Sequence, residues 1–400
     1  MPRPGWRKPV SDRRFPDLVS VGLLMKVFPA EIVDEVIAEC GRTEQRRRSL
    51  PARSMAYFAM GMALHSEGSY EDVLALISDG IAWANRDEDS PRLANKAAIS
   101  HARDRLGPEP MKLLFERVVQ PIGVDVTPGC WLAGRRLVAI DGTCLDLPDT
   151  PANDEHFGRP GVSKGERSAF PQARVVAVAE CGTHAIFDAE IGPYTTSERA
   201  LSTGLLGRLV SGMLCLADRG FYSFTAWQDA CNTGADLLWR VMDNLKLEPI
   251  EELADGSWLA EVFDSVKDRR RQHPRRVRVI EYTIEDGREK AGPYRLITTI
   301  LDHHDAPAAD LAAAYSQRWE IETAFDELKT HQRGPRTVLR SKSPDLATQE
   351  IWGHLCCHYA IRTLMFEAAT HAGHDPDRVS FVAAIRIARR SIAQQGAFPP

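Results

Sequence analysis

The sequence predicts an α/β protein, with an all-α N-terminal region followed by a mixed domain that a β-rich insertion interrupts. Three observations predict this organisation. Between residues 17 and 120, apolar residues recur at a spacing of three or four, as in amphipathic helices. Beyond residue 134, short apolar runs alternate with turn residues, as in strands. The predicted order there is β, β, β, α, β, α, β and then a further helix, which is the element order of a ribonuclease-H-like fold.

The first predicted region, residues 1–120, is helical. The stretches "LVSVGLLMKVFPAEIVDEVIAEC", "SLPARSMAYFAMGMALHS" and "SYEDVLALISDGIAWA" show almost no strand alternation. A short basic helix follows and stops at Leu106-Gly107-Pro108. It carries four polar residues suited to reading DNA: Lys96, Ser100, Arg103 and Arg105. An ordinary solvated helix face is the alternative interpretation.

Residues 121–240 carry the first part of the mixed domain. "RRLVAIDGT" predicts a strand, and "ARVVAVAECGTHAIFDAEI" predicts two strands joined by a turn at Gly182-Thr183. A helix begins at Ser197, and the strand "GMLCLADRG" ends in Asp218. The helix "SFTAWQDACNTG" and the strand "ADLLWRVM" complete this part. We expect an antiparallel hairpin on one side of the sheet, parallel strands on the other, and helices covering the sheet.

Residues 241–300 are predicted to form the β-rich insertion, because "DGSWLAEVFD", "RRVRVIEYTIED" and "YRLITTILD" alternate like strands. Residues 301–400 complete the mixed domain. They begin with a helix that includes "YSQRWEIETAFDELK" and end with two helices, in "LATQEIWGHLCCHYAIRTLMFEAATHA" and "DRVSFVAAIRIARRSIAQQ". The insertion therefore splits the mixed domain in sequence.

The composition limits the kinds of protein that this chain can be. The 400 residues are 44% hydrophobic and 26% charged, as in ordinary globular chains. There is neither a run of about 18 apolar residues nor the apolar centre of a signal peptide, so we expect a cytoplasmic protein without a membrane partner. The eight cysteines lack a C-x-x-C pair and are expected to be buried free thiols. A net charge of −5 argues weakly against a nucleic-acid partner, but the basic residues are clustered.

The helix "YSQRWEIETAFDELK" separates a polar row from an apolar stripe. At about 100° per residue, four polar residues fall within an arc of roughly 60°: Tyr315, Arg318, Glu322 and Lys329. The apolar stripe is Ala314, Ile321, Phe325 and Leu328. We therefore expect that burial does not need the polar row. Lys329 is free to bind phosphate. For Arg318, a simple surface ion pair with Glu322 is the alternative interpretation. Tyr315, at the head of the same row, favours a phosphate-binding face that includes Arg318.

Three carboxylates are candidates for a metal site. Asp141 directly follows the apolar run "LVAI", Asp218 ends the fourth predicted strand, and Glu322 lies on the following helix. Strands that end together bring their carboxylates to one edge of the sheet, where they need a counter-charge. Oxygen ligands suit Mg²⁺ or Mn²⁺. Two such ions about 4 Å apart can activate the attacking oxygen and stabilise the leaving oxygen of a phosphodiester displacement.

Other carboxylates remain alternatives at this point. An aspartate at a strand end is most often a turn or cap residue. Asp146 and Asp149 compete with Asp141, although both lie in a loop that contains proline. Asp326 lies one helical turn beyond Glu322 and competes with it.

The spacing Y-x2-R-x3-E-x6-K resembles the signature of the insertion-sequence-four family of DDE transposases. "AIDGTCLDLPDTPANDEHFG" is similar to the family's first aspartate block and "LADRGFYSF" to its second, with an insertion before the third. The resemblance extends from about Asp17 to Arg390 and includes a helical N-terminal DNA-binding domain. It implies that a DDE triad binds two divalent metal ions: Asp141, Asp218 and Glu322. It also implies that Tyr315, Arg318 and Lys329 hold the DNA backbone near the cut.

The resemblance further implies a bacterial insertion-sequence transposase that binds terminal inverted repeats of double-stranded DNA. Such enzymes cut the transposon ends with water, pass through a hairpin in several relatives, and join the freed 3′-OH to target DNA. A dimer on DNA, a nucleoid-associated location and no organic cofactor are expected. Relatives often continue into a basic tail, whereas this chain stops at "QQGAFPP", which suggests a truncated or shortened copy. A structure-specific nuclease and a decayed or domesticated DNA-binding protein remain alternatives.

The insertion contains a basic run, "VKDRRRQHPRRVRVIEY", which we expect to lie beside the carboxylate site. It is predicted to contact DNA, because an acidic site needs cations to hold a polyanion. Solvated charge is the alternative. The run contains Lys267, Arg269, Arg270, Arg271, Arg275, Arg276 and Arg278. Four residues after the helix extend the predicted groove: Arg333, Arg336, Arg340 and Lys342. Trp258 is the candidate to stack on a flipped base, and Trp239 is expected in the core. The histidines show no metal-ligand pattern.

Overall fold

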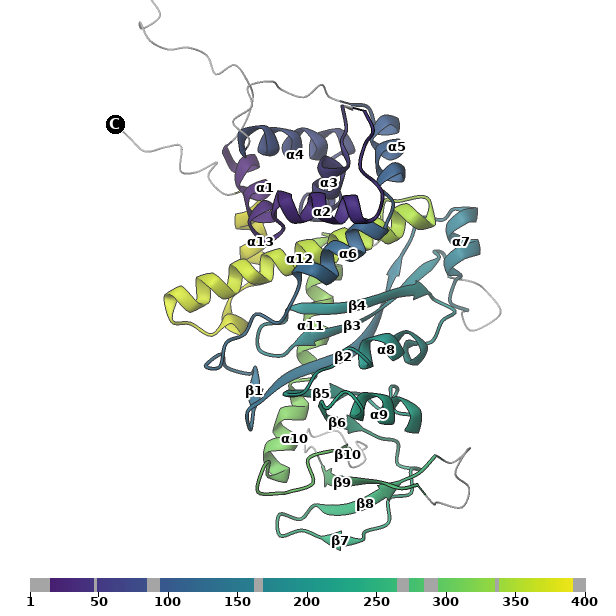
Figure 1. Ribbon diagram of the computed structural model, residues 1–400, viewed down its shortest axis with the longest axis vertical. Helices are drawn as coiled ribbons and strands as arrows, with labels where there is room; N and C mark the ends of the chain where they lie inside the picture. Colours follow the sequence, from purple (N-terminus) through teal and green to yellow (C-terminus); the bar gives the residue numbers. More distant parts are fainter. Residues whose placement is uncertain are drawn as a thin grey trace, which may run out of the picture.

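The computed structural model has a mixed α/β architecture in which α-helices lie above a long sheet (Figure 1). It describes residues 15–46, 49–84, 94–161, 168–264, 273–283, 294–334 and 338–390. Within these ranges, none of the helices combines the length and apolar character needed to cross a membrane. The long helix α12 (Pro344–Ala372) lies between the N-terminal helices and the sheet.

The N-terminal region is helical, as its apolar spacing predicts. It contains α1 (Phe15–Val27), α2 (Ala30–Glu39), α3 (Ala52–Leu64), α4 (Tyr70–Ala84), α5 (Lys96–Leu106) and α6 (Glu109–Val118). Helix α3 is buried along most of its length and crosses α12 closely. A Cβ atom on Gly353 of α12 would lie 2.5 Å from the carbonyl oxygen of Ala59, so this crossing requires a glycine.

The prediction that the face of α5 reads DNA is wrong for Arg103. Its side chain is fully buried. Its Nε donates to Oε1 of Gln349 at 2.8 Å, and its Nη2 donates to Oγ of Ser341 at 3.0 Å. A buried guanidinium needs such partners, and here they tie α5 to the start of α12. Lys96 and Arg105 are exposed.

The sheet has the predicted antiparallel strands on one side and parallel strands on the other. Strand β2 (Arg135–Asp146) pairs antiparallel with β3 (Gln172–Glu180), which pairs antiparallel with β4 (Ile186–Pro193). On its other side β2 pairs parallel with β5 (Met213–Ala217), and β5 pairs parallel with β6 (Asp236–Arg240). The predicted turn between β3 and β4 is present, with Gly182 at φ +79°.

The predicted insertion contains strands that extend the same sheet. They are β7 (Glu251–Glu252), β8 (Trp258–Val262), β9 (Arg275–Tyr282) and β10 (Tyr294–Thr298). Strand β10 pairs antiparallel with β6 and joins the insertion to the central strands. With the short strand β1 (Trp131–Leu132) beside β2, the described residues form a ten-stranded sheet.

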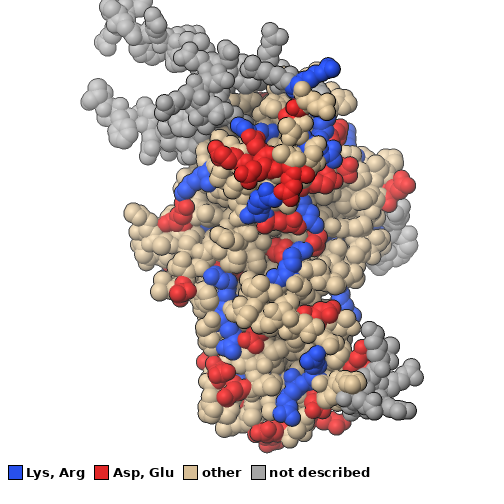
Figure 2. All heavy atoms as spheres, in the orientation of Figure 1, with Lys and Arg blue, Asp and Glu red and all other residues tan. Residues whose placement is uncertain are grey.

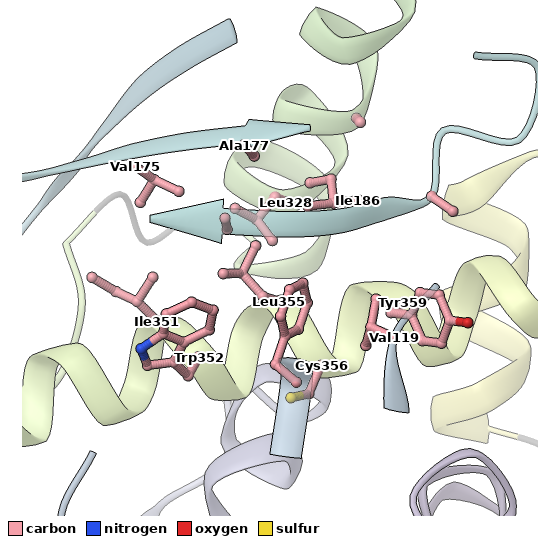
Figure 3. Close-up of a cluster of buried hydrophobic side chains, with 14 of the residues drawn as sticks. Val119, Val175, Ala177, Ile186, Leu328, Ile351, Trp352, Leu355, Cys356 and Tyr359 are labelled. Atoms are coloured by element: carbon pink, nitrogen blue, oxygen red, sulfur yellow. The ribbon is translucent and has the colours of Figure 1, made fainter. Parts of the chain in front are cut away.

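Helices cover both faces of the sheet, and a hydrophobic core lies on each. Helices α8 (Glu198–Leu206) and α9 (Phe224–Cys231) pack on the face that carries Ile140 and Trp239. On the opposite face, one continuous core joins the sheet, α12 and the N-terminal helices. Figure 3 shows this core around α12, where Trp352 packs on Phe115 of α6 at a ring distance of 5.3 Å. The predicted boundary at residue 120 therefore does not separate two cores.

The described structure also contains α7 (Pro151–Phe157), the 3₁₀ turn η2 (Pro376–Arg378) and α13 (Phe381–Arg390). All eight cysteines are free thiols, and five of them are buried: Cys130, Cys181, Cys215, Cys356 and Cys357.

The prediction of one continuous helix through Tyr315 and Lys329 is wrong. The chain forms α10 (Ala308–Ser316), α11 (Trp319–Asp326) and the π-helix η1 (Glu327–Gln332). Between α10 and α11, the N–H of Arg318 bonds to the carbonyl oxygen of Tyr315 at 3.1 Å, which is a tighter turn than in an α-helix. The wider turn of η1 accompanies burial of Glu327, Leu328 and Gln332 together.

Candidate active site

Asp141 and Asp218 lie at the same level on neighbouring parallel strands. Ile140 of β2 pairs with Ala217, the last residue of β5, so Asp141 is level with Asp218. The prediction that Asp141 ends its strand is wrong, because β2 continues to Asp146 alongside β3. The parallel neighbour nevertheless stops at Ala217. Both carboxylates therefore lie at the edge where the β2–β5 pairing ends.

Arg318 connects Asp141 to Glu322. Its Nη1 lies 3.1 Å from Oδ2 of Asp141, and its Nη2 lies 3.0 Å from Oε1 of Glu322. The predicted i, i+4 pair is present, and it joins an Arg318 side chain that is only 8% exposed to a Glu322 side chain that is 44% exposed. One guanidinium thus brings carboxylates from β2 and α11 together and supplies a shared counter-charge.

Tyr315 lies beside Asp218, and the prediction that burial does not need it is wrong. The residue is buried within the core that contains α12. Its hydroxyl lies 3.4 Å from the carbonyl oxygen of Ala217 and 3.5 Å from Oδ1 of Asp218. Burial raises the pKa of Tyr315, and the nearby charge of Asp218 adds to this. The phenol therefore stays neutral and can donate a hydrogen bond.

Lys329 follows on the same side of the helix. Its Nζ donates to Oγ1 of Thr143 at 3.1 Å, two residues beyond Asp141 on β2. Burial raises the pKa of Asp141 to about 6, against the opposing effects of the Gly142 N–H and the Arg318 charge. The site thus contains a desolvated carboxylate beside the Arg318 guanidinium, with Lys329 bonded two residues further along β2.

The chemistry of this carboxylate group suits hard divalent cations. The side chains of Asp141, Asp218 and Glu322 offer only oxygen donors, and their exposed fractions are 19%, 36% and 44%. Their ligand atoms do not all lie within 4.8 Å of one another. The three side chains therefore do not share a single ion in this arrangement.

The alternative carboxylates have other partners. Asp146 accepts a hydrogen bond from Nε2 of Gln172 at 2.8 Å, and Asp149 forms an ion pair with Arg159. Asp326 accepts from Oγ1 of Thr330 at 2.6 Å. None of these three contacts Arg318 in the described structure.

Sequence reasoning missed Arg240 and an aromatic pair next to Asp218. Arg240 ends β6, the next parallel strand, and its Nη1 lies 3.9 Å from Oδ1 of Asp218. Its guanidinium lies over the ring of Tyr294 at 4.1 Å, and Tyr294 stacks on Tyr282 at 5.4 Å. The rule that parallel strands end together could have found Arg240. Trp319, the first residue of α11, was also missed; it is 53% exposed.

The predicted DNA contact at Arg278 is wrong. Its side chain is fully buried on β9, where its Nη2 pairs with Oδ2 of Asp255 at 2.5 Å. Its Nε donates to Oγ of Ser257 and its Nη1 to the carbonyl oxygen of Ala306, both at 2.8 Å. These bonds hold the β7–β8 turn and the start of α10. Arg278 is therefore a structural residue.

The other basic residues of the run divide into two groups. Lys267, Arg269, Arg270 and Arg271 lie outside the described residues. Arg275 and Arg276 are exposed, but the prediction that they lie beside the carboxylates is wrong. Leu296 of β10 pairs with both Arg240 of β6 and Ile280 of β9, so Ile280 lies at the same level of the sheet as Arg240. Arg275 and Arg276 precede Ile280 on β9 and therefore lie further from Asp218.

Among the residues after the helix, Arg333 is buried, so the prediction of an exposed DNA contact there is wrong. Burial lowers the pKa of Arg333. Arg336 lies outside the described residues. Arg340 lies over the ring of Tyr70 at 4.6 Å, and Lys342 is exposed.

Trp258 faces the wrong side of the sheet for the predicted stacking role. It pairs with Val279 of β9, in a row that continues across the sheet to Ala217 and Ile140. Paired residues share one face, and successive residues alternate between faces. Trp258 therefore packs on the core under α8 and α9, opposite the face of Asp141. Trp239 lies in this core, as predicted.

Comparison with known proteins identifies the family. The family model for the insertion element 4 transposase N-terminal region matches residues 18–116, and the one for the transposase DDE domain matches residues 132–360. The transposase InsG for insertion sequence element IS4 of Escherichia coli strain K12 is 30% identical over 376 residues. This match covers 92% of the chain and 82% of InsG.

One similar solved structure is the cryo-EM structure of a piggyBac transposase synaptic complex with hairpin DNA. It has a TM-score of 0.48 and 12% identity, over 94% of this chain and 80% of the other. The two family models and the similarity to InsG show that this chain belongs to the IS4 family of DDE transposases, and that it is the DNA-cleaving transposase of an insertion sequence.

Proposed function

We propose that Asp141, Asp218 and Glu322 form the catalytic triad and hold two divalent cations, Mg²⁺ or Mn²⁺. The observation that carries this proposal is the bridge from Arg318 to Asp141 and Glu322 at 3.1 and 3.0 Å. DDE transposases generally use divalent metal ions. Ions bound here supply the positive charge that activates water and stabilises the leaving oxygen. The strand order supports a ribonuclease-H-like fold for this domain.

The neighbouring residues bind and orient. Tyr315 fixes Asp218 through its hydroxyl, and Arg318 holds Asp141 and Glu322 in register before DNA arrives. Lys329 lies at the same edge and binds a backbone phosphate. Arg240 provides a second cation on the opposite flank of Asp218. Lys329 and Arg240 thus bind the DNA backbone on either side of the carboxylates, whereas Tyr315 and Arg318, which are buried, act by holding the carboxylates.

The DNA partners are the terminal inverted repeats and the target, bound by a dimer in the cytoplasm at the nucleoid. The acidic face of the N-terminal region does not meet DNA. Figure 2 shows acidic side chains gathered over the N-terminal helices. On α2 and α6 the exposed ones are Glu31, Glu35, Glu39, Glu109 and Glu116. Like charge repels the phosphate backbone, so the N-terminal region binds DNA through another face.

Metal removal tests this function. With Mg²⁺, the protein should cut duplex DNA at the inverted repeats that flank its gene and join the freed 3′ ends to a target plasmid. Chelation with EDTA should lower cleavage by about 10³-fold or more, because metal ions supply several kcal/mol of transition-state stabilisation. Gel analysis of labelled DNA measures both steps. Cutting without joining would indicate a nuclease, and DNA binding without cutting would indicate a decayed protein.

Tyr294 is a better candidate than Trp258 for stacking on an extruded base. It is half-buried, contacts Arg240 beside Asp218, and lies with Tyr282 on the face of the sheet that carries Asp141. Stacking of one base on an aromatic ring contributes about 1–3 kcal/mol. Tyr294→Ala should therefore abolish most of the fluorescence increase of a 2-aminopurine placed at the transposon end, and Tyr294→Trp should retain it.

Trp258→Phe is the matched control for this experiment. It keeps an aromatic side chain in the core under α8 and α9 and should leave the fluorescence change intact. Loss of the signal in Trp258→Phe, with no loss in Tyr294→Ala, would return the stacking role to Trp258.

A further inference from the structure

Behind the candidate active site, the helix that carries Glu322 has a second polar row. Glu320 and Glu327 lie about two helical turns apart and so on one side of the helix. Glu322 and Lys329 have the same spacing on nearly the opposite side. The rear side chains are largely buried, with 18% of Glu320 and 6% of Glu327 exposed. The rear row therefore faces the interior, and the front row faces the carboxylate edge.

Glu327 is held by two polar side chains of α12, one of them the Arg362 guanidinium. Its Oε2 accepts a hydrogen bond from Nε of Arg362 at 2.8 Å and lies 3.1 Å from Nε2 of His358. Its Oε1 pairs with Nη2 of Arg362. Burial would raise the pKa of Glu327, but the bonds to His184 and His358 and the charge of Arg362 lower it. Glu327 is therefore a buried carboxylate with a matched cation.

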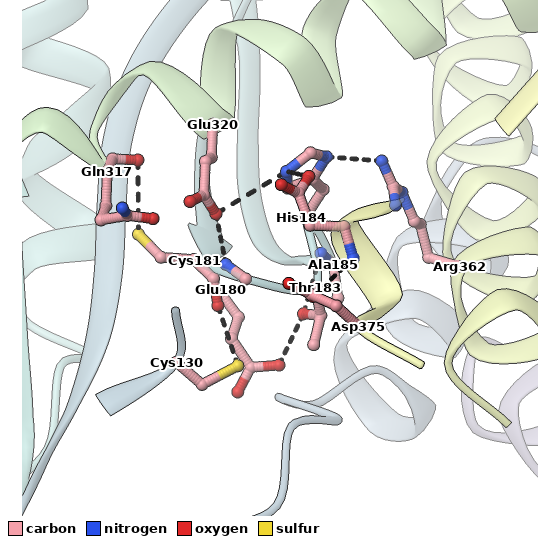
Figure 4. A network of polar contacts seen from close by, with 12 residues as sticks. Cys130, Glu180, Cys181, Thr183, His184, Ala185, Gln317, Glu320, Arg362 and Asp375 are labelled. Carbon is pink, nitrogen blue, oxygen red and sulfur yellow. Dashed lines mark hydrogen bonds and ion pairs between the residues drawn. The ribbon is translucent and has the colours of Figure 1, made fainter. Parts of the chain in front are cut away.

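Glu320 is anchored on the turn between β3 and β4. It accepts a hydrogen bond from the backbone N–H of Gly182, and its Oε2 lies 3.7 Å from Nε2 of His184 (Figure 4). His184 in turn reaches Glu327, with 3.7 Å between Nδ1 and Oε1. The backbone of His184 has φ +55°, which is uncommon for a residue with a Cβ atom. Such a conformation is strained and persists only where surrounding contacts impose it.

Helix α11 depends on such contacts for its placement. It has only eight residues, it follows the break after α10, and no side chain caps its N-terminus. Isolated helices shorter than about 12 residues are marginal in water. Its C-terminus leads into the π-helix that carries Lys329, and π turns are frequent at functional sites. The rear contacts therefore decide where the front row lies.

We propose that Glu327, assisted by Glu320, is a positioning residue for the active site. It fixes the orientation of α11 and thereby sets Arg318 and Glu322 against Asp141. This inference rests on the proposed catalytic role of Glu322. Loss of a buried ion pair that only stabilises the fold lowers stability. Loss of a positioning residue also loosens α11 and changes how readily the carboxylates bind metal.

The test is Glu327→Gln in the full-length protein, which removes the charge and keeps the shape. Amide hydrogen exchange in residues 319–332 should accelerate by about tenfold or more, because local opening of α11 becomes easier. Cleavage of inverted-repeat DNA should fall by about 10²-fold, as expected for a misplaced catalytic group. The Mg²⁺ concentration for half-maximal cleavage should rise, while DNA affinity should stay within about twofold because no DNA contact is removed.

Asp255→Asn is the matched control. It breaks another buried pair, with Arg278, at the far end of the sheet. It should lower the melting temperature without changing exchange in α11 or the Mg²⁺ requirement. Glu320→Gln is a second variant, less buried, that should act in the same direction if Glu327→Gln does not fold.

Equal losses of stability in Glu327→Gln and Asp255→Asn, with unchanged exchange in α11, would overturn the positioning role. Failure of the wild-type protein to cleave DNA with Mg²⁺ would instead refute the proposed function. In that case the exchange measurement still tests whether Glu327 anchors α11, so the two failures are distinguishable.

Discussion

Asp141→Asn, Asp218→Asn and Glu322→Gln should each abolish DNA cleavage while leaving inverted-repeat binding nearly intact. Each substitution removes a negative charge from the carboxylate edge, where Asp141 and Glu322 share Arg318 and Asp218 lies beside Tyr315. Metal-assisted stabilisation of several kcal/mol corresponds to a loss of about 10³-fold or more in rate. Cleavage is measured on labelled DNA with Mg²⁺, and binding is measured by gel shift in its absence.

Asp146→Asn and Asp326→Asn are matched controls, because each removes one negative charge close in sequence to a triad residue. Asp146 lies on the same strand as Asp141 and bonds to Gln172, and Asp326 lies on the same helix as Glu322 and bonds to Thr330. Both variants should cleave at rates close to wild type. Full cleavage by Asp218→Asn, or loss of cleavage in Asp326→Asn, would contradict the assignment of the triad.

Arg278→Ala should destabilise the protein by about 3–5 kcal/mol, because it leaves the charge of Asp255 largely buried without its cation. Hydrogen bonds from Ser257 and Ala308, together with the charge of Arg278, outweigh the opposing effect of burial and lower the pKa of Asp255 to about 2. The stabilisation is therefore complete above about pH 4, the ordinary pKa of an aspartate, and is lost as pH falls towards 2. Denaturant unfolding at several pH values measures the change.

Arg275→Ala and Arg276→Ala are the comparison for this residue. Both side chains are exposed on the same strand, so their removal should change stability by no more than about 0.5 kcal/mol. The DNA affinity of folded Arg278→Ala should match that of wild type, because the guanidinium is not at the surface. A stable Arg278→Ala variant with weakened DNA binding would restore the predicted DNA contact.

Local sequence patterns predicted the elements well, because period and turn chemistry are local properties. The N-terminal helices, the β3–β4 hairpin and the helix capped by Ser197 all follow from short windows. The alignment of Asp141 with Asp218 also follows from a short rule, since parallel strands place their C-terminal ends at one edge. The predicted end of the strand at Asp141 was wrong, because β2 continues beyond Asp141 in its pairing with β3.

Long-range partners could not be predicted in this way. In the sequence, Arg103 and Arg278 resemble surface cations. In the structure both are buried, where Arg103 donates a hydrogen bond to Gln349 and Arg278 forms an ion pair with Asp255. The face of Trp258 depends on the register across β8, β9, β10 and β6, and a shift of one residue would reverse it. The break before Arg318 likewise lies next to a long-range contact, the pair between Arg318 and Asp141 of β2.

The mid-strand position of Asp141 has a consequence for the energetics of the reaction. Its backbone pairs with Ala177 of β3, so the peptide frame beneath the carboxylate is already ordered when substrate arrives. Electrostatic catalysis is most effective when charged groups need little reorganisation at the moment of bond cleavage. The conformational entropy of this residue is therefore lost once, during folding, and not again in every catalytic cycle.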